Sequence, residues 1–229
     1  MRAAIMQPTY LPYIGYFDLM RRVDVFVFLD DVQLERRSWQ TRNRIWAAGQ
    51  EQMLSISLRK HNQTDRLDEV VLNDESDWRT KHLNALENAY RKRPGFAEGM
   101  DFIRPHLTPQ PDQKLSDFNI GIIEDAARRL GIATATQRAA AMGCGGKRSE
   151  HLLAICRAVG ATHYVSPTGS RDYMEEEGVF RAAGFPVEYF SHAPKPYPQG
   201  FEPFVPYMAF VDAVMNVGFA GLSEVLGDA

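Results

Sequence analysis

Cysteine is scarce in this chain of 229 residues, which has only Cys144 and Cys156. The two form neither a metal-ligand spacing nor a disulfide framework, and this favours a reducing compartment over secretion. Long apolar runs are also missing. The run over residues 2–6 stops at Pro8, too early for a signal peptide, and no stretch of about 18 apolar residues could span a bilayer. We therefore expect a cytoplasmic protein without a membrane span.

Excess charge and familiar catalytic motifs are absent as well. The formal net charge is -3, so composition gives no global electrostatic reason to expect nucleic acid as a partner. The chain has no HExxH, no GxSxG and no cluster of cysteine and histidine, so zinc and hydrolase chemistry lose their usual support. We expect no metal site, and we interpret His82 and His151 as structural residues.

The clearest structural pattern lies in the first 33 residues. An apolar run is followed by an aromatic turn, a segment with helical spacing over 15–22 and a second apolar run over 23–29, which predicts a strand, a helix and a strand. From residue 132 short strands and helices alternate. The predicted segments are strand 134–138, helix 148–159, strand 162–166, helix 171–183 and strand 186–190. Such alternation predicts crossover connections and a mainly parallel sheet.

Between these two regions the pattern predicts a hairpin and then helices. Residues 44–46 and 53–58 flank a glycine-containing turn, and helical spacing follows over 78–91, 96–106 and 115–130. A largely apolar segment, 204–219, predicts a last helix packed on the sheet. The expected fold is a single three-layer, Rossmann-like α/β domain over 1–229, with a mainly parallel central sheet, a helical insert at about 77–130 and a C-terminal helix.

Polar residues collect where the first two predicted strands end. Ligands bind beyond the carboxyl ends of parallel strands, so Gln7 at the first tip is a candidate substrate-binding residue. Adjacent carboxylates on one strand point to opposite faces, and of the pair at the second tip we assign Asp31 to the site. Asp31 and Tyr10 are the predicted catalytic residues. Tyr16 and Gln33 are predicted to bind substrate.

An arginine-rich segment over 36–44 holds four arginines around one tryptophan. Guanidinium groups bind phosphate or carboxylate in a bidentate manner, and an aromatic plane can stack a base or cover a sugar ring. Trp39, Arg42 and Asn43 are therefore predicted to bind substrate. The alternative is a solvated charged face.

Two further segments place polar groups between a strand or turn and a helix. The glycine-rich turn over 143–149 leads into a helix, whose N-terminal amides suit an anion, so Arg148 and Ser149 form a candidate phosphate cradle. A flexible loop is the alternative. Thr168, Gly169 and Tyr173 follow the tip of the next strand and are predicted to line the same crevice as Gln7 and Asp31.

Several of these motifs together resemble the WbqC-like family. They are QPTYLPYIGYF, DVFVFLDDVQ, RSWQTRNRI, Trp78 with His82, the helix that begins with Lys147-Arg148-Ser149, GATHYVSPTGSRDY and Tyr197-Pro198-Gln199. The resemblance implies a bacterial protein associated with surface polysaccharide or O-antigen gene clusters. It also adds Gln199 to the candidate substrate-binding residues.

A weaker similarity concerns the layout of the first strand, turn, helix and second strand, which looks like nucleotidylyltransferases and pantothenate synthetases. Their turn carries His-x-Gly-His, which binds ATP phosphates, whereas Tyr13 and Tyr16 stand at the two histidine positions here. Neutral phenols supply no imidazolium charge, so the similarity implies a nucleotidylyltransferase-like fold rather than adenylyl transfer.

These observations predict a transferase that acts on a nucleotide-linked sugar or an activated acyl or aminoacyl donor, and the family resemblance implies a place in O-antigen biosynthesis. The expected partner is a small-molecule substrate, and no cofactor is assigned. The alternative is a non-catalytic binding or scaffold protein in glycan assembly. A catalytic site should hold a titratable residue in the crevice, whereas a scaffold should expose an apolar patch, for which residues 201–219 are the candidate.

Overall fold

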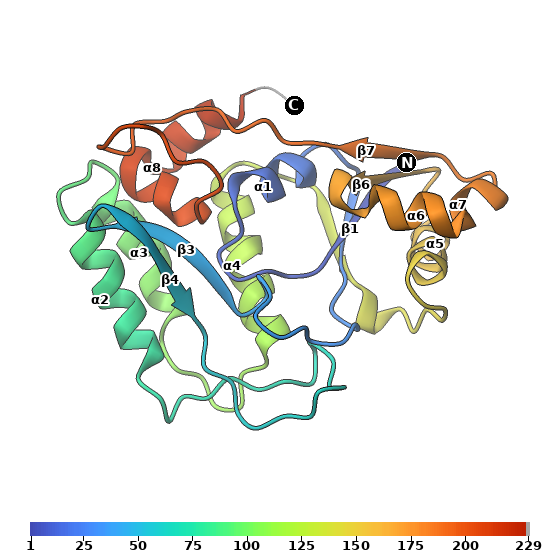
Figure 1. The fold of residues 1–229 in the computed structure, drawn as a ribbon, viewed down its shortest axis with the longest axis horizontal. Coiled ribbons are helices and arrows are strands. Elements are labelled where there is room, and N and C mark those ends of the chain that lie inside the picture. The colour runs from blue at the N-terminus through green and yellow to red at the C-terminus, as the bar shows by residue number, and fades with distance from the viewer. Residues whose placement is uncertain (228–229) are drawn as a thin grey trace.

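Five parallel strands form the central sheet of the protein, of which the computed structural model describes residues 1–227 (Figure 1). Across the sheet the order is β5 (Ala135–Arg138), β2 (Val25–Phe28), β1 (Arg2–Met6), β6 (His163–Pro167) and β7 (Val187–Phe190). The chain extends the sheet from β1 to one side through β2 and β5, and then to the other side through β6 and β7. The switch point of this Rossmann-like topology therefore lies between β1 and β6.

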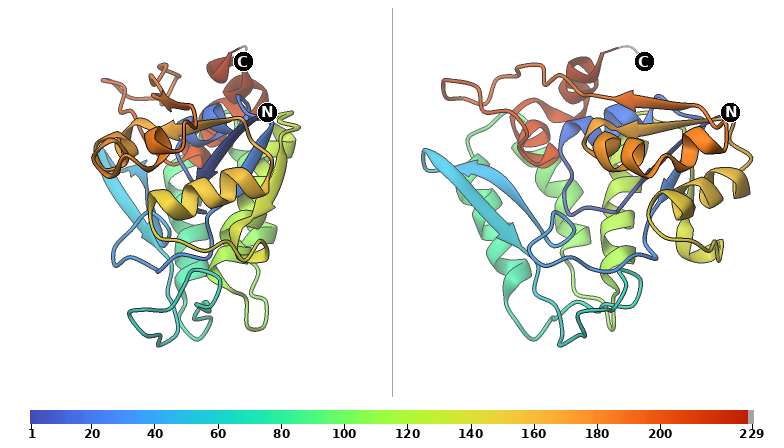
Figure 2. Two further views of the ribbon diagram at one scale, coloured as in Figure 1. Left: turned by 90° about the vertical axis from the view of Figure 1, so that its right-hand side faces the viewer. Right: turned by 45° about the vertical axis from the view of Figure 1, so that its right-hand side comes forward.

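Alternate residues of the central strands face two separate hydrophobic cores. On β2, Phe26 and Phe28 enter one core, while Val25 and Val27 enter the other. The first core is completed by α1 (Ile14–Met20), α2 (Trp78–Tyr90), α3 (Phe96–His106), α4 (Leu115–Arg129) and α8 (Phe210–Leu226). The second core is completed by α5 (Ser149–Ala158), α6 (Arg171–Glu177) and α7 (Val179–Ala182). The predicted three-layer α/β fold is thus confirmed (Figure 2).

A separate two-stranded hairpin consists of β3 (Arg42–Ala47) and β4 (Gln50–Ser55). Ala48 and Gly49, the two loop residues, both have positive φ (50° and 79°), as a tight hairpin turn with the twist of the flanking strands requires. The three helices α2, α3 and α4 then lie between β4 and β5 in sequence, where helical spacing predicted them. Short 3₁₀ turns, Ala139–Ala141 and Thr168–Ser170, follow β5 and β6.

Two predicted helices have different bounds in the structure. The helix expected over 171–183 is divided at Gly178, whose φ of 63° ends α6 in the left-handed conformation. The last helix begins at Phe210 rather than at Phe204, because the backbone before it is bonded elsewhere. The N–H groups of Ala209 and Phe210 donate to the carbonyls of Arg44 and Pro12. No helix within residues 1–227 is long and apolar enough to cross a membrane.

Candidate functional site

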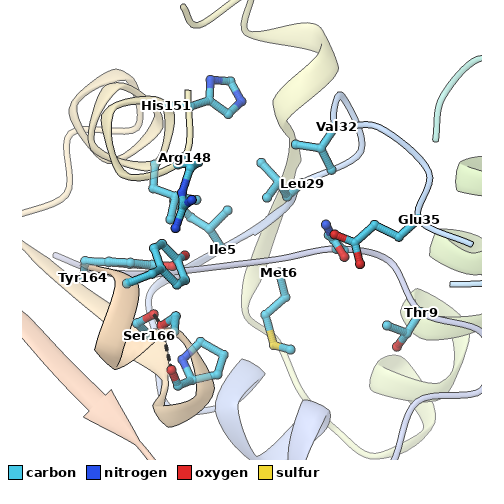
Figure 3. Close-up of a pocket in the computed structure, with 15 residues that line it drawn as sticks. Ile5, Met6, Thr9, Leu29, Val32, Glu35, Arg148, His151, Tyr164 and Ser166 are labelled. Atoms are coloured by element: carbon cyan, nitrogen blue, oxygen red, sulfur yellow. Dashed lines mark hydrogen bonds between the residues drawn. The ribbon is translucent and has the colours of Figure 1, made fainter. Parts of the chain in front are cut away.

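A cavity of about 630 Å³ lies at the switch point, beyond the carboxyl ends of β1 and β6 (Figure 3). This volume is within the range of small-molecule sites, roughly 300 to 1,000 Å³. Its lining comes from segments far apart in sequence: Ile5, Met6, Gln7, Thr9, Leu29, Val32, Glu35, Arg148, His151, Leu152, Tyr164, Ser166, Pro167, Ser170 and Tyr173. We call it the switch-point cavity.

His151, on the first turn of α5, is hydrogen-bonded to Asp31 at the edge of this cavity. Its Nε2 lies 3.1 Å from Oδ2 and 3.2 Å from Oδ1 of Asp31, and its Nδ1 lies 3.2 Å from the carbonyl oxygen of Gly145. Both ring nitrogens therefore lie within hydrogen-bond distance of oxygen atoms of the protein. The two side chains are only about a tenth exposed, so the pair is held largely out of water.

Arg148 precedes α5 in a conformation that side chains rarely adopt, with φ of 51° and ψ of -122°. Its guanidinium pairs with the carboxylate of Glu177 and lies 5.0 Å from the centre of the Tyr173 ring. The backbone N–H of Ser149 donates to the same carboxylate. Hydrogen bonding from Ser149 and the charge of Arg148 lower the pKa of Glu177. Unfavourable backbone geometry of this kind is concentrated at functional sites, where the surrounding structure maintains it.

Hydrogen bonds at the strand tips fix further parts of the lining. Gln7 follows β1, and its side-chain oxygen accepts a hydrogen bond from the buried amide of Gln40. At the tip of β6, the hydroxyl groups of Ser166 and Ser170 are hydrogen-bonded to each other, and the Ser170 hydroxyl also donates to the Pro167 carbonyl. The lining thus combines these amide and hydroxyl groups with apolar side chains such as Ile5, Leu29 and Leu152.

Several predicted site residues come together here. Gln7, Arg148 and Tyr173 line the cavity, and Asp31 contacts His151, which also lines it. Gln7 and Tyr173 therefore lie at the same edge of the sheet, as parallel strands predict. Ser149 is buried just behind Arg148. Thr168 and Gly169 lie on the adjacent exposed turn, where the Thr168 hydroxyl donates to the carbonyl of Phe190.

Other predicted site residues lie outside the switch-point cavity. Tyr10 is fully buried, and its hydroxyl donates to Nδ1 of His82. The Tyr16 hydroxyl donates to the backbone carbonyl of Gln7. Gln33 is exposed and donates to the carbonyl of Gln63. Gln199 is buried in a cluster around Asp212. Each of these side chains has a structural partner, and their roles toward a substrate stay predictions.

The arginine-rich segment contributes to a second cavity of about 350 Å³. It is lined by Met6, Thr9, Pro12, Tyr13, Tyr16, Trp39, Asn43, Arg44 and Tyr207. Trp39 and Asn43 are thus placed together as candidates, although apart from Arg148 and His151. Arg42, on β3, is half-buried and is not part of either lining among the described residues.

The site residues predicted from the sequence do not include His151, Glu35, Ser166 or Ser170, although the last two belong to the same segment as Thr168, Gly169 and Tyr173. His151, interpreted from the sequence as a structural residue, contacts Asp31 and lines the cavity. Its position three residues after Arg148 was an available signal, because residues at this spacing share a helix face. The contact with Asp31 spans 120 residues and had no local signal. Within residues 1–227 no group of three or more His, Cys, Asp or Glu side chains is arranged to hold a metal ion.

The fold and cavity define an α/β protein with a ligand-sized site at the switch point of a parallel sheet. The sequence model of the WbqC-like protein family matches residues 7–224, and the chain belongs to this family. It is also 31% identical over 218 residues to the uncharacterized protein Rv1507c of Mycobacterium tuberculosis, an alignment that covers 95% of this chain and 94% of that protein. No solved structure matches the chain significantly.

Proposed function

We propose that the protein is a nucleotide-binding transferase of bacterial surface polysaccharide (O-antigen) biosynthesis, which moves a sugar or an acyl or aminoacyl group from an activated small-molecule donor. The observation that carries this proposal is the switch-point cavity, with Arg148 and His151 on one wall. Arg148 contacts Glu177 through Nε, so its two terminal amino groups can still donate to a ligand, which favours a donor whose leaving group is anionic, such as a nucleoside diphosphate.

In this reaction the acceptor oxygen or nitrogen bonds to the transferred carbon as the bond from that carbon to the leaving group breaks. The leaving group keeps the electron pair, and Arg148 and His151 stabilise its developing negative charge. Asp31 holds the His151 ring in place through Nε2. Glu35, the carboxylate that lines the cavity, takes up the acceptor's proton.

Burial of the apolar tail favours this proposal over a scaffold role. In a scaffold, residues 201–219 are the expected exposed apolar patch, but within this range only Glu202, Pro203 and Tyr207 are exposed, and residues 208–216, 218 and 219 are buried. They pack into the core that also contains α1 and α3. The titratable side chains of His151 and Glu35, by contrast, line the cavity. Both observations match the pattern expected of a catalytic site.

Thermal shift with a ligand panel tests donor binding. The panel contains nucleoside diphosphates, nucleoside-diphosphate sugars and acyl-coenzyme A, because ligand binding to the folded state raises Tm by mass action. We expect a saturable rise for at least one class, and a Kd at least tenfold weaker in Arg148→Gln. Arg157→Gln is the matched control, since Arg157 is an exposed arginine at the other end of α5. No saturable shift, or equal loss in both variants, would contradict the proposal.

Turnover of the donor identified in this way tests the chemistry. Product formation is followed by mass spectrometry, and His151→Asn is expected to reduce kcat by about 10² to 10³ with little change in donor Kd, the range found when one group that stabilises developing charge is removed. His163→Asn, which changes an exposed histidine on β6, should leave kcat unchanged. Full activity of His151→Asn would remove His151 from the mechanism.

A further inference from the structure

The second cavity, here called the aromatic cleft, adjoins the switch-point cavity. Met6 and Thr9 line both spaces. In the close-up the Met6 side chain lies between Ser166 and Thr9 in the lining of the switch-point cavity (Figure 3). A molecule bound in the cleft therefore lies next to a donor bound at the switch point.

Exposed aromatic surface is concentrated at this cleft. Among residues 1–227, Trp39 and Tyr207 are the exposed aromatic side chains, each about 50% exposed, and both line the cleft. Tyr207 also has φ of 60°, which is unfavourable for a bulky side chain. Exposed aromatic groups gathered in a concave site indicate a binding surface, because leaving large apolar side chains in water does not stabilise the folded chain.

The charge within the cleft is already neutralised. The Arg44 guanidinium lies 5.9 Å from the centre of the Trp39 ring and pairs with Glu51, its Nη1 being 3.0 Å from each carboxylate oxygen. Arg44 also donates to the carbonyl of Tyr207. This ion pair holds the cleft's walls in place, and it leaves little reason for the cleft to select an anion. The occupant that fits is electrically neutral.

The amide in the lining is occupied as well. Asn43 donates from Nδ2 to the carbonyls of Tyr10 and Leu11, at 3.1 and 2.7 Å, and its Oδ1 accepts from the N–H of Arg44. A nucleobase is recognised by hydrogen bonds to its edge, and the Asn43 amide already uses its nitrogen and its oxygen in hydrogen bonds within the protein. The groups that remain are aromatic faces together with the hydroxyls of Thr9, Tyr13 and Tyr207.

We infer that the aromatic cleft binds a neutral saccharide ring, which is the acceptor in the proposed transfer. A pyranose has a face of C–H groups that packs on an aromatic ring, and its hydroxyls are satisfied by phenol hydroxyls and water at the rim. The acceptor role rests on the proposed function, whereas saccharide binding is a property of the cleft itself and is measured without a donor.

Titration of the protein with methyl glycosides of glucose, galactose and N-acetylglucosamine, followed by saturation-transfer NMR and isothermal calorimetry, tests this inference. Uridine and adenosine serve as competing ring probes. We expect at least one glycoside to bind, with affinity at least tenfold weaker in Trp39→Ala and in Tyr207→Ala. Trp46→Ala is the matched control, because Trp46, on β3, stacks on Phe201 and is not part of the cleft's lining.

Three results would overturn the inference: no glycoside binds, glycoside affinity is the same in both cleft variants as in the unchanged protein, or the nucleosides bind in the Trp39-dependent manner instead. Circular dichroism and Tm establish that each variant is folded. Donor binding, measured by thermal shift, separates the two proposals. If the unchanged protein binds a donor but no glycoside, the cleft assignment alone is refuted, whereas glycoside binding by the unchanged protein without any donor binding refutes the transferase proposal.

Discussion

At the residue scale, the environment of an ionisable side chain decides whether it takes part in chemistry or packing. His82 and His151 both lie on helices and are both largely buried. His82 has a tyrosine hydroxyl and a backbone carbonyl as neighbours, whereas His151 has the Asp31 carboxylate and faces a cavity. The sequence predicted burial for both, but the partners that distinguish them lie 72 and 120 residues away. Only tertiary structure supplies that information.

His82 should make stability depend on pH. Burial lowers the pKa of His82 to about 4, against an ordinary value of 6.5. Between these values the unfolded chain binds a proton that the folded protein excludes, so stability is full above pH ~6.5 and falls as pH drops toward ~4, by about 3 kcal/mol. Urea unfolding between pH 7.5 and 4.5 measures this. His82→Gln should show a smaller pH dependence, while exposed His61→Gln retains it. An unchanged dependence in His82→Gln would refute the assignment.

The two cysteines should differ in reactivity. Burial raises the pKa of the Cys156 thiol to about 12, so almost no thiolate forms at pH 8, whereas Cys144 is partly exposed. We expect iodoacetamide to label Cys144 in the folded protein and Cys156 only after unfolding, as followed by peptide mass spectrometry. Cys144→Ser should abolish native labelling and leave ligand binding intact. Rapid native labelling of Cys156, or loss of turnover in folded Cys144→Ser, would contradict this prediction.

At the scale of elements, local pattern predicted most of the fold. The helix predicted over 96–106 is α3 with the same bounds, and the predicted parallel strands all occur. The largest error in helix bounds lies where backbone groups form hydrogen bonds with distant segments. Residues 204–209 are apolar but include Pro206, which disfavours a helix through this segment, and Ala209 pairs with Tyr13 in an isolated bridge, so the helix begins only after it. Sequence alone cannot weigh a helical hydrogen bond against one to a distant strand.

Two glycines in helical segments should respond oppositely to alanine. Gly121, inside α4, has open space where a Cβ would go, so Gly121→Ala should stabilise the protein by about 0.5 to 1 kcal/mol. Gly178 has φ of 63° at the end of α6, where alanine is strained, so Gly178→Ala should destabilise it by about 1 kcal/mol. Urea unfolding of both variants measures these changes. Equal effects of the two substitutions would mean that Gly178 does not require its left-handed conformation.

At the scale of the whole molecule, the candidate site is assembled by topology rather than by any one motif. Parallel strands place Gln7 and Tyr173, which are 166 positions apart, in one cavity lining, and this arrangement followed from strand order and crossover geometry. Tyr10 and Gln33 lie in equally polar segments near strand ends, but their side chains pack inward or point outward. Direction of a side chain in a loop depends on its partners, and the motif that contains it does not specify them.

The hydrogen bonds of Gln199 in the cluster around Asp212 indicate that Gln199 supports the fold rather than binds substrate. The Asp212 carboxylate, on α8, accepts hydrogen bonds from Tyr90 on α2, and from Tyr197 and Gln199 in the segment before α8. Burial raises the pKa of Asp212, so the charged form depends on these donors. The Gln199 side chain is also hydrogen-bonded to the backbone of Val205: its Nε2 donates to the Val205 carbonyl, and its Oε1 accepts from the Val205 N–H. Its contacts therefore join three parts of the chain and leave its amide engaged.

Gln199→Ala should accordingly lower stability and leave ligand affinity unchanged. Removing a donor to a buried carboxylate and the two bonds to Val205 should cost about 2 to 3 kcal/mol in the free energy of unfolding. Gln110→Ala, at an exposed glutamine in the loop before α4, is the control and should change stability by less than about 0.5 kcal/mol. Urea unfolding measures the first effect, and titration with whichever donor and glycoside bind measures the second. A Gln199→Ala protein with unchanged stability and weakened ligand affinity would reverse the assignment, because only a side chain free of structural partners can be lost in that way.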